Sequence, residues 1–190
     1  MKVNDNWRDS THHIISSATG FQSSQLKALF EDQLREIYGA EKELLKAFPK
    51  MLKNATSDEL IEILEDQLAL TPEHIIRIGQ VFKVLGKRAL AEKCKAMEEI
   101  IIEGKEIMED CGKGGTCDAG IISVCKKIKH YEIASYGILY QFAGTLRLMD
   151  VANLLQQTLN EEKDTDDRLS KIVVNAENIK AEIAEREAEF

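Results

Sequence analysis

The chain has 190 residues, an ordinary length for one compact domain, and 44% of them are apolar and 31% charged, as in globular rather than disordered proteins. Its net charge of −8 disfavours partners with phosphate backbones or anionic surfaces, so we expect no nucleic-acid or membrane partner. No apolar run approaches the ~18 residues that a membrane helix needs, and residues 1–20 lack the apolar stretch of a signal peptide, so a cytoplasmic location is expected.

The first predicted helix follows a weakly patterned N-terminus. Residues 1–22 show no sustained apolar period and are predicted to form a loosely ordered arm. From Ser23 onward, apolar residues recur at alternating steps of three and four, which is typical of a helix packed lengthwise against others. The repeat predicts a helix over about 23–53 and consists of Leu26, Phe30, Leu34, Ile37, Leu44, Phe48 and Met51.

The second helix is predicted to begin at a capping box, Thr56-Ser57-Asp58-Glu59, with Thr56 bonding the amide of Glu59. It should run to about Leu85 and end at Gly86. Its buried stripe is apolar at both ends but polar in the middle, where it carries Gln67, Thr71 and His74.

A shorter helix over about 89–109 links the two halves of the chain and ends in a glycine cluster at 112–115. This cluster lacks the GxxxxGK[ST] spacing of a phosphate-binding loop. Asp118 can cap the third long helix. A fourth begins at Asp150, and residues 174–190 are predicted to form a charged helical tail. Together these elements predict an all-α antiparallel four-helix bundle with an extra shorter helix between the second and third bundle helices.

Three carboxylates occupy positions that the helical period assigns to the core. Glu41 lies between Ile37 and Leu44 on the first long helix, and Glu132 and Glu162 have similar places on the third and fourth. A carboxylate is strongly disfavoured in a low-dielectric interior unless it is protonated, paired or bound to metal. Each could instead be partly exposed or join a buried salt bridge.

Hairpin geometry brings these carboxylates to a common level. A turn near residue 55 sets Glu41 opposite Leu70 to His74, and a turn near residue 149 sets Glu132 opposite Glu162 and Asp166. Four-helix bundles hold carboxylate-bridged pairs of metal ions with this arrangement, and carboxylates with a few imidazoles suit iron or manganese. The predicted metal ligands are Glu41, His74, Glu132, Glu162 and Asp166. His74 can equally be a core residue with satisfied hydrogen bonds, and Tyr38, Tyr131 and Tyr136 can bond the carboxylates or serve as core aromatics.

Five segments of the chain resemble the bacterial YciE/YciF stress-protein family, a branch of the ferritin-like superfamily. They lie within residues 24–173 and are LREIYGAEK at 34–42, QVF with LG at 80–86, KCKAME at 93–98, HYEIASYG at 130–137 and TLNEEKDTD at 158–166. The resemblance implies a ferritin-like domain over 23–173, commonly a homodimer, with a di-metal centre and an unsettled activity linked to stress. Leu29, Leu45 and Leu52 add apolar surface to the first helix that a homodimer could cover.

The chain departs from the family pattern in its second helix. Family members usually carry acidic residues just before the threonine and a histidine further upstream, where this chain has Gln67, Ala69 and Leu70. Leu70 removes a carboxylate that would neutralise a second ion. We therefore expect one weakly held ion, or an empty site with protonated or water-linked carboxylates, rather than a full pair.

Three functions are compatible with this sequence. The first is a metal-binding stress-response protein that acts on peroxide, oxygen or ferrous iron through a degraded di-metal site. The second is a structural or interaction protein that keeps the fold without a functional metal centre, and the third is metal storage without turnover. The four cysteines contain no CxxC pair and are expected to be reduced structural thiols.

Overall fold

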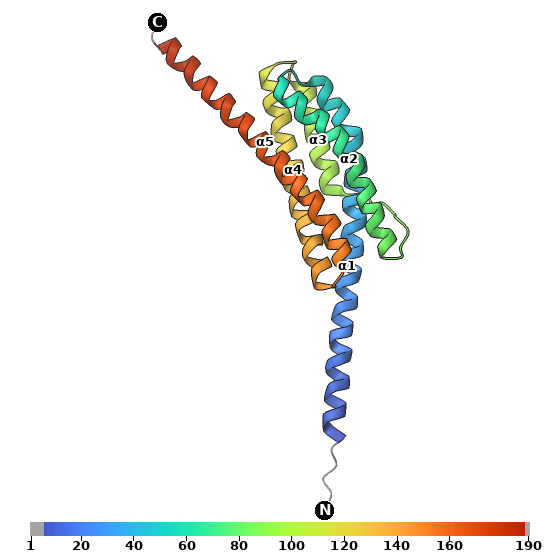
Figure 1. Ribbon diagram of the computed structural model, residues 1–190. Coiled ribbons are helices and arrows are strands. Elements are labelled where there is room, and N and C mark those ends of the chain that lie inside the picture. Colours follow the sequence, from blue (N-terminus) through green and yellow to red (C-terminus); the bar gives the residue numbers. More distant parts are fainter. Residues whose placement is uncertain (1–5, 189–190) are drawn as a thin grey trace, which may run out of the picture.

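The computed structural model describes the backbone of residues 6–188 and the side chains of residues 23–173. It contains five helices within these bounds: α1 (Asn6–Asn54), α2 (Asp58–Val84), α3 (Lys95–Asp110), α4 (Gly115–Thr145) and α5 (Met149–Ala188). The four long helices form an antiparallel bundle, and α3 is the extra shorter helix (Figure 1). The predicted fold class is confirmed.

The bundle has a fixed order of neighbours. The hairpin partners pack together, α1 on α2 and α4 on α5, and the two hairpins join through contacts of α1 with α4 and of α2 with α5. The short helix α3 lies against α4 and α1. Side chains from four different helices can therefore meet on the bundle axis.

Apolar burial explains why these segments are helical. Six of the seven repeat positions predicted on α1 are buried: Phe30, Leu34, Ile37, Leu44, Phe48 and Met51. Removing such side chains from water contributes about 1.5–3 kcal/mol each, which outweighs modest differences in helix propensity. Pro49 and Pro72 are accommodated inside α1 and α2.

Several predicted boundaries need correction. The first helix begins at Asn6 rather than near residue 23, while the side-chain packing of the predicted arm lies outside the described residues. The linking helix begins at Lys95 rather than near residue 89, because residues 87–94 form an irregular segment. The predicted helical tail needs no such correction, because α5 continues through it to Ala188.

The cap of α2 is also corrected. Ser57, not Thr56, is its N-cap residue, and the Ser57 side chain accepts a hydrogen bond from the amide of Leu60. Asp118 lies inside α4, which begins at Gly115, and its carboxylate instead accepts hydrogen bonds from Thr56 and Ser57. A single acidic side chain thus connects the start of α4 to the start of α2.

The irregular segment 87–94 is held against α1. The amide of Glu92 donates to the carbonyl oxygen of Arg35 at 3.0 Å, and Arg35 Nε donates to Glu92 Oε1 at 2.7 Å. This close approach requires Gly39, because a Cβ atom there would lie 1.8 Å from the carbonyl oxygen of Glu92. Gly39 is therefore a packing residue.

Replacing Gly39 with alanine should lower the free energy of unfolding by about 2 kcal/mol, because the backbone of residue 92 must move away. Gly79 is the matched control, since nothing lies within 4 Å of a Cβ atom built there. Gly79→Ala should raise the free energy of unfolding by about 0.5–1 kcal/mol through helix propensity. Urea titration of both variants checks the pair, and equal shifts would contradict the packing role of Gly39.

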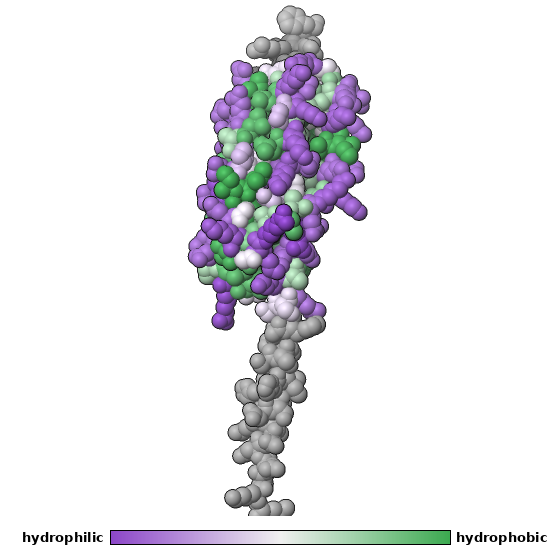
Figure 2. All heavy atoms as spheres, turned by 90° about the vertical axis from the view of Figure 1, so that its right-hand side faces the viewer, coloured by the Kyte–Doolittle hydropathy of each residue, from purple (hydrophilic) through white to green (hydrophobic). Residues whose placement is uncertain are grey.

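The surface carries scattered apolar side chains. On the face shown in Figure 2 they form separate patches between hydrophilic ones. Leu29 and Leu45 are 46% and 36% exposed, and Leu52 is partly buried. The homodimer expected to use them stays a prediction.

Candidate metal site

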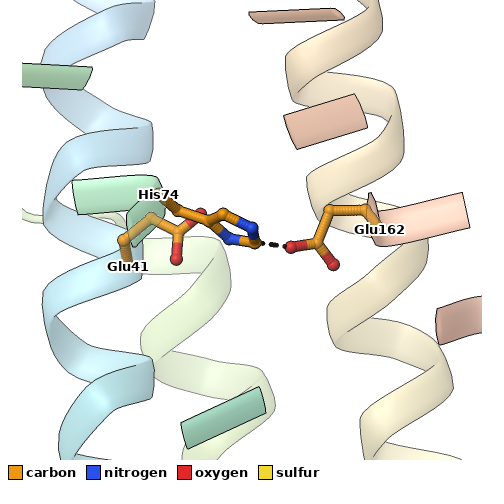
Figure 3. Close-up of side chains that lie close together, drawn as sticks. All are labelled: Glu41, His74 and Glu162. Atoms are coloured by element: carbon orange, nitrogen blue, oxygen red, sulfur yellow. Dashed lines mark ion pairs between the residues drawn. The ribbon is translucent and has the colours of Figure 1, made fainter. Parts of the chain in front are cut away.

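Three groups able to bind a metal ion meet on the bundle axis. They are Glu41 of α1, His74 of α2 and Glu162 of α5, and one ligand atom from each lies within 4.8 Å of the others (Figure 3). His74 Nδ1 is 3.0 Å from Glu162 Oε1 and 3.5 Å from Glu41 Oε1. All three side chains are buried, so the group is shielded from bulk water.

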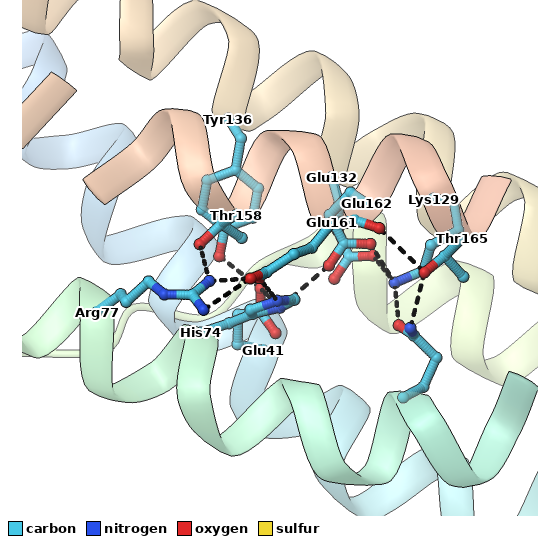
Figure 4. Close-up of polar contacts among 11 residues, drawn as sticks. Glu41, His74, Arg77, Lys129, Glu132, Tyr136, Thr158, Glu161, Glu162 and Thr165 are labelled. Atoms are coloured by element: carbon cyan, nitrogen blue, oxygen red, sulfur yellow. Dashed lines mark hydrogen bonds and ion pairs between the residues drawn. The ribbon is translucent and has the colours of Figure 1, made fainter. Parts of the chain in front are cut away.

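The His74 ring is oriented from its solvent side by Glu161. His74 Nε2 lies 3.0 Å from Glu161 Oε2. Arg77 in turn binds both oxygens of Glu161 and donates to Thr158 Oγ1 at 3.0 Å (Figure 4). An imidazole whose outer nitrogen donates to a carboxylate presents the lone pair of its inner nitrogen, as metal-binding histidines commonly do.

Glu41 is held by a tyrosine. Tyr136 Oη donates to Glu41 Oε1 at 2.5 Å. Burial, followed by the charge of Glu41, raises the pKa of Tyr136 well above its ordinary value, so the phenol keeps its proton and can act as the donor. The other two candidate tyrosines have different partners, since Tyr131 contacts the Cys94 thiol and Tyr38 packs against Phe82.

The fourth predicted ligand, Glu132, faces a cation that the sequence analysis missed. Lys129 of α4 is 1% exposed, and its Nζ lies 2.5 Å from Glu132 Oε2. The same ammonium donates to Glu162 Oε2 (Figure 4). It also donates to Gln67 Oε1. Glu162 therefore directs one oxygen toward His74 and the other toward Lys129.

The fifth predicted ligand, Asp166, lies outside this group. Its Oδ1 is 2.6 Å from Lys126 Nζ and 3.3 Å from His130 Nε2 at the edge of the bundle. The buried position on this turn of α5 belongs to Thr165, which accepts a hydrogen bond from Gln67. Leu70, the departure from the family pattern, is partly buried on α2.

Strong electrostatic coupling shifts the pKa values within the cluster. Burial lowers the pKa of His74, but its ion pairs with Glu162 and Glu41 outweigh burial and raise the pKa from 6.5 to about 10. Burial raises the pKa of Glu162, but Lys129 and His74 outweigh it and lower the pKa to about 2. Burial, followed by the neighbouring Glu162, raises the pKa of Glu132 well above its ordinary value, so this carboxyl holds a proton more readily than Glu162.

The donor atoms of the cluster fit a divalent cation. Glu41 Oε2 is buried and has no hydrogen-bond partner, which is costly for a polar group in a protein interior, while His74 Nδ1 and Glu162 Oε1 face each other at 3.0 Å. With a neutral histidine, the three glutamates and Lys129 carry a formal net charge of −2, from three negative charges and one positive. A divalent ion balances this charge, and a protonated His74 with one protonated carboxyl balances it without an ion.

The fold and this cluster define a class of protein, namely helical bundles with carboxylates and a histidine buried at their centre. The family described as "Domain of unknown function (DUF892)" matches residues 25–183. This chain belongs to that family, in agreement with the resemblance found in the sequence. No helix in the described part of the chain is long and apolar enough to cross a membrane.

The protein is similar to several known relatives. It is 37% identical over 158 residues to Protein YciF of Escherichia coli strain K12, covering 83% of this chain and 95% of the relative. The crystal structure of the E. coli stress protein YciF superposes with a TM-score of 0.77 at 36% identity, covering 80% of this chain and 97% of that one.

Two further structures share the fold. YcfI of Rhodopseudomonas palustris, provisionally described as a structural protein, has a TM-score of 0.73 at 35% identity and covers 76% of this chain and 92% of that one. A protein from Xanthomonas campestris pv. campestris has a TM-score of 0.62 at 19% identity, covering 86% and 99%. The last likeness concerns the fold alone.

Proposed function

We propose that this protein is a ferritin-like stress-response protein that binds one iron or manganese ion through Glu41, His74 and Glu162. The observation that carries the proposal is the convergence of two buried carboxylates and a buried imidazole from three helices, with one ligand atom of each within 4.8 Å of the others. Two carboxylates and one imidazole suit either metal. Three protein ligands leave coordination positions open on an ion that prefers six.

Neighbouring residues hold two of these ligands in position by hydrogen bonds. Tyr136 positions Glu41, and the pair of Glu161 with Arg77 holds the His74 ring while separating it from solvent. Glu161 is 25% exposed and Arg77 13%, so this pair forms the side of the cluster nearest to water. A bound ion would supply redox chemistry toward peroxide, oxygen or ferrous iron, which the carboxylates alone cannot perform.

A second function is favoured by a different observation. The cluster already contains two internal cations when His74 is protonated, and these form ion pairs with its carboxylates. The bundle can therefore be a structural or interaction protein that keeps the fold without a functional metal centre. The provisional structural description of the R. palustris relative agrees with this alternative.

Metal titration separates the two functions. The proposal expects one Mn²⁺ or Fe²⁺ bound per chain by calorimetry, with tighter binding at pH 8 than at pH 6, because the ion displaces the proton of His74. Loss of a residue that only hydrogen-bonds a metal ligand typically lowers metal affinity about 10–100-fold, so loss of a ligand should lower it further. Glu41→Gln preserves the side-chain shape but should weaken metal binding by more than about 100-fold.

Asp166→Asn is the matched control, because Asp166 pairs with Lys126 and His130 instead. The metal affinity of the Asp166→Asn variant should equal that of the wild type. A wild-type protein that binds no metal would support the structural alternative. If metal binds but neither peroxide nor ferrous iron is consumed, the protein stores metal rather than turning over a substrate.

A further inference from the structure

The surroundings of Lys129 resemble those of a bound cation. Its Nζ has three oxygen neighbours, from Glu132, Glu162 and Gln67, matching the three N–H groups of an ammonium. The side chain is 1% exposed, whereas lysine is almost never fully buried unless it is paired. This ammonium therefore occupies a buried cage of three oxygens on the bundle axis.

The cage shares a ligand with the candidate metal site. Glu162 Oε2 accepts from Lys129, and Glu162 Oε1 lies 3.0 Å from His74 Nδ1 on the other side. One carboxylate thus connects two positions that each suit a positive charge. A carboxylate shared in this manner is the geometry by which helical bundles bridge two metal ions.

A further hydrogen bond fixes Gln67, one of the residues around Lys129. Gln67 Nε2 donates to Thr165 Oγ1 at 3.0 Å, which turns the amide oxygen of Gln67 toward Lys129. Thr165 Oγ1 in turn donates to the carbonyl oxygen of Glu161 at 3.1 Å. The amide oxygen of Gln67 is therefore held in place by a partner other than Lys129.

We propose that Lys129 is a built-in cation that occupies the second position of a two-cation site, so that the chain has room for only one exchangeable metal ion. This inference rests on the proposed function, which predicts one bound ion in the wild type. Removal of the ammonium leaves Glu132 and Glu162 with unpaired oxygens in a dry interior, and a divalent ion is the natural replacement. Lys129 then sets the metal stoichiometry of the bundle.

The test is Lys129→Ala, which removes the charge and leaves space for an ion. The variant should bind two Mn²⁺ per chain where the wild type binds one, measured by elemental analysis after gel filtration. Its electron paramagnetic resonance spectrum should be that of an exchange-coupled Mn²⁺ pair, because Glu162 would bridge the ions. Lys127→Ala is the control, since Lys127 lies two residues away, is 45% exposed and pairs with Glu103.

The outcomes distinguish this inference from the proposed function. Zero ions in the wild type and one in Lys129→Ala would support the role of Lys129 and contradict metal binding by the native cluster. One ion in both proteins would overturn the role of Lys129 and leave the proposed function intact. No ion in either protein would overturn both.

Folding of the variant provides a second readout. Without metal, Lys129→Ala should melt at a lower temperature than the wild type, and Mn²⁺ should restore much of this loss. Lys129→Met with Glu132→Gln removes the charge and one acid together, so it should fold without metal and bind no second ion. If this double variant folds while Lys129→Ala stays unfolded even with Mn²⁺, a metal ion cannot replace the ammonium and the inference is wrong.

Discussion

Replacing Glu162 with alanine should lower the free energy of unfolding of the metal-free protein by about 3–5 kcal/mol, the usual effect of removing one partner from a buried ion pair. The loss is large because Glu162 pairs with both Lys129 and His74, and each of these is only 1% exposed. The variant therefore leaves two buried groups without their shared partner. Urea titration in the presence of a chelator measures the change.

The effect of Glu162 should also depend on pH in a defined direction. Its pKa is lowered from 4.5 to about 2, so its contribution is fully present above pH 4.5 and is lost as the pH falls toward 2. The difference between wild type and variant should shrink over that interval. Asp164→Ala, an exposed acid on the same helix, should change stability by no more than about 0.5 kcal/mol at any pH. Similar losses for the two variants would show that Glu162 is not part of a buried ion-pair cluster.

The fold could be predicted from the sequence because its signal is long and repeated. Each of the four bundle helices carries an apolar stripe over many turns, and the direction of every side chain on a helix follows from its spacing. Local features were less predictable. The cap of α2 depends on Asp118, which is 61 residues from Ser57 in the chain, and no local pattern encodes such a contact.

The candidate site could be predicted only in part. Periodicity correctly assigns Glu41, His74 and Glu162 to the interior, where the structure brings them together. It does not decide between Thr165 and Asp166 on α5, because both lie about one turn beyond Glu162 and only the packing against α2 and α4 separates them.

Lys129 was missed because a lysine beside an apolar stripe usually extends its ammonium to solvent. A signal for its burial does exist. Steps of four, three and four residues connect Cys125, Lys129, Glu132 and Tyr136, all of which are buried. An excess of acids on the bundle axis also requires a nearby positive charge, and Lys129 is the lysine on this stripe of α4.

The buried cluster depends on the number of positive charges on the bundle axis. Glu41, Glu132 and Glu162 need compensation, and the chain can supply it from Lys129, from a protonated His74 or from a bound ion. A metal ion competes with the proton of His74 but not directly with Lys129. Stability and metal content should therefore respond to the same substitutions.

Replacing Asp118 with alanine should lower the free energy of unfolding by about 3 kcal/mol, the second largest effect expected here. The Asp118 carboxylate is 6% exposed and accepts from the amide of Thr56 at 2.8 Å, from Thr56 Oγ1 at 2.7 Å and from the amide of Ser57 at 2.9 Å. Loss of a helix cap typically costs about 0.5–2 kcal/mol, and each hydrogen bond to a charged acceptor contributes about 1.5–3 kcal/mol. The negative charge beside the N-terminus of α2 adds a favourable interaction with the helix dipole.

Substitutions that remove different numbers of these hydrogen bonds test whether their loss causes the destabilisation. Asp118→Asn keeps one acceptor oxygen and should lose less than Asp118→Ala, while Thr56→Val removes only the hydroxyl hydrogen bond and should lose about 1 kcal/mol. Asp110→Ala, an exposed acid at the end of α3, should change stability by no more than about 0.5 kcal/mol. Hydrogen exchange provides the local readout, because amides in the first turn of α2 should lose protection before those of α5 in Asp118→Ala. If protection falls equally throughout the bundle, Asp118 acts through general packing of α4 rather than as the cap that joins α4 to α2.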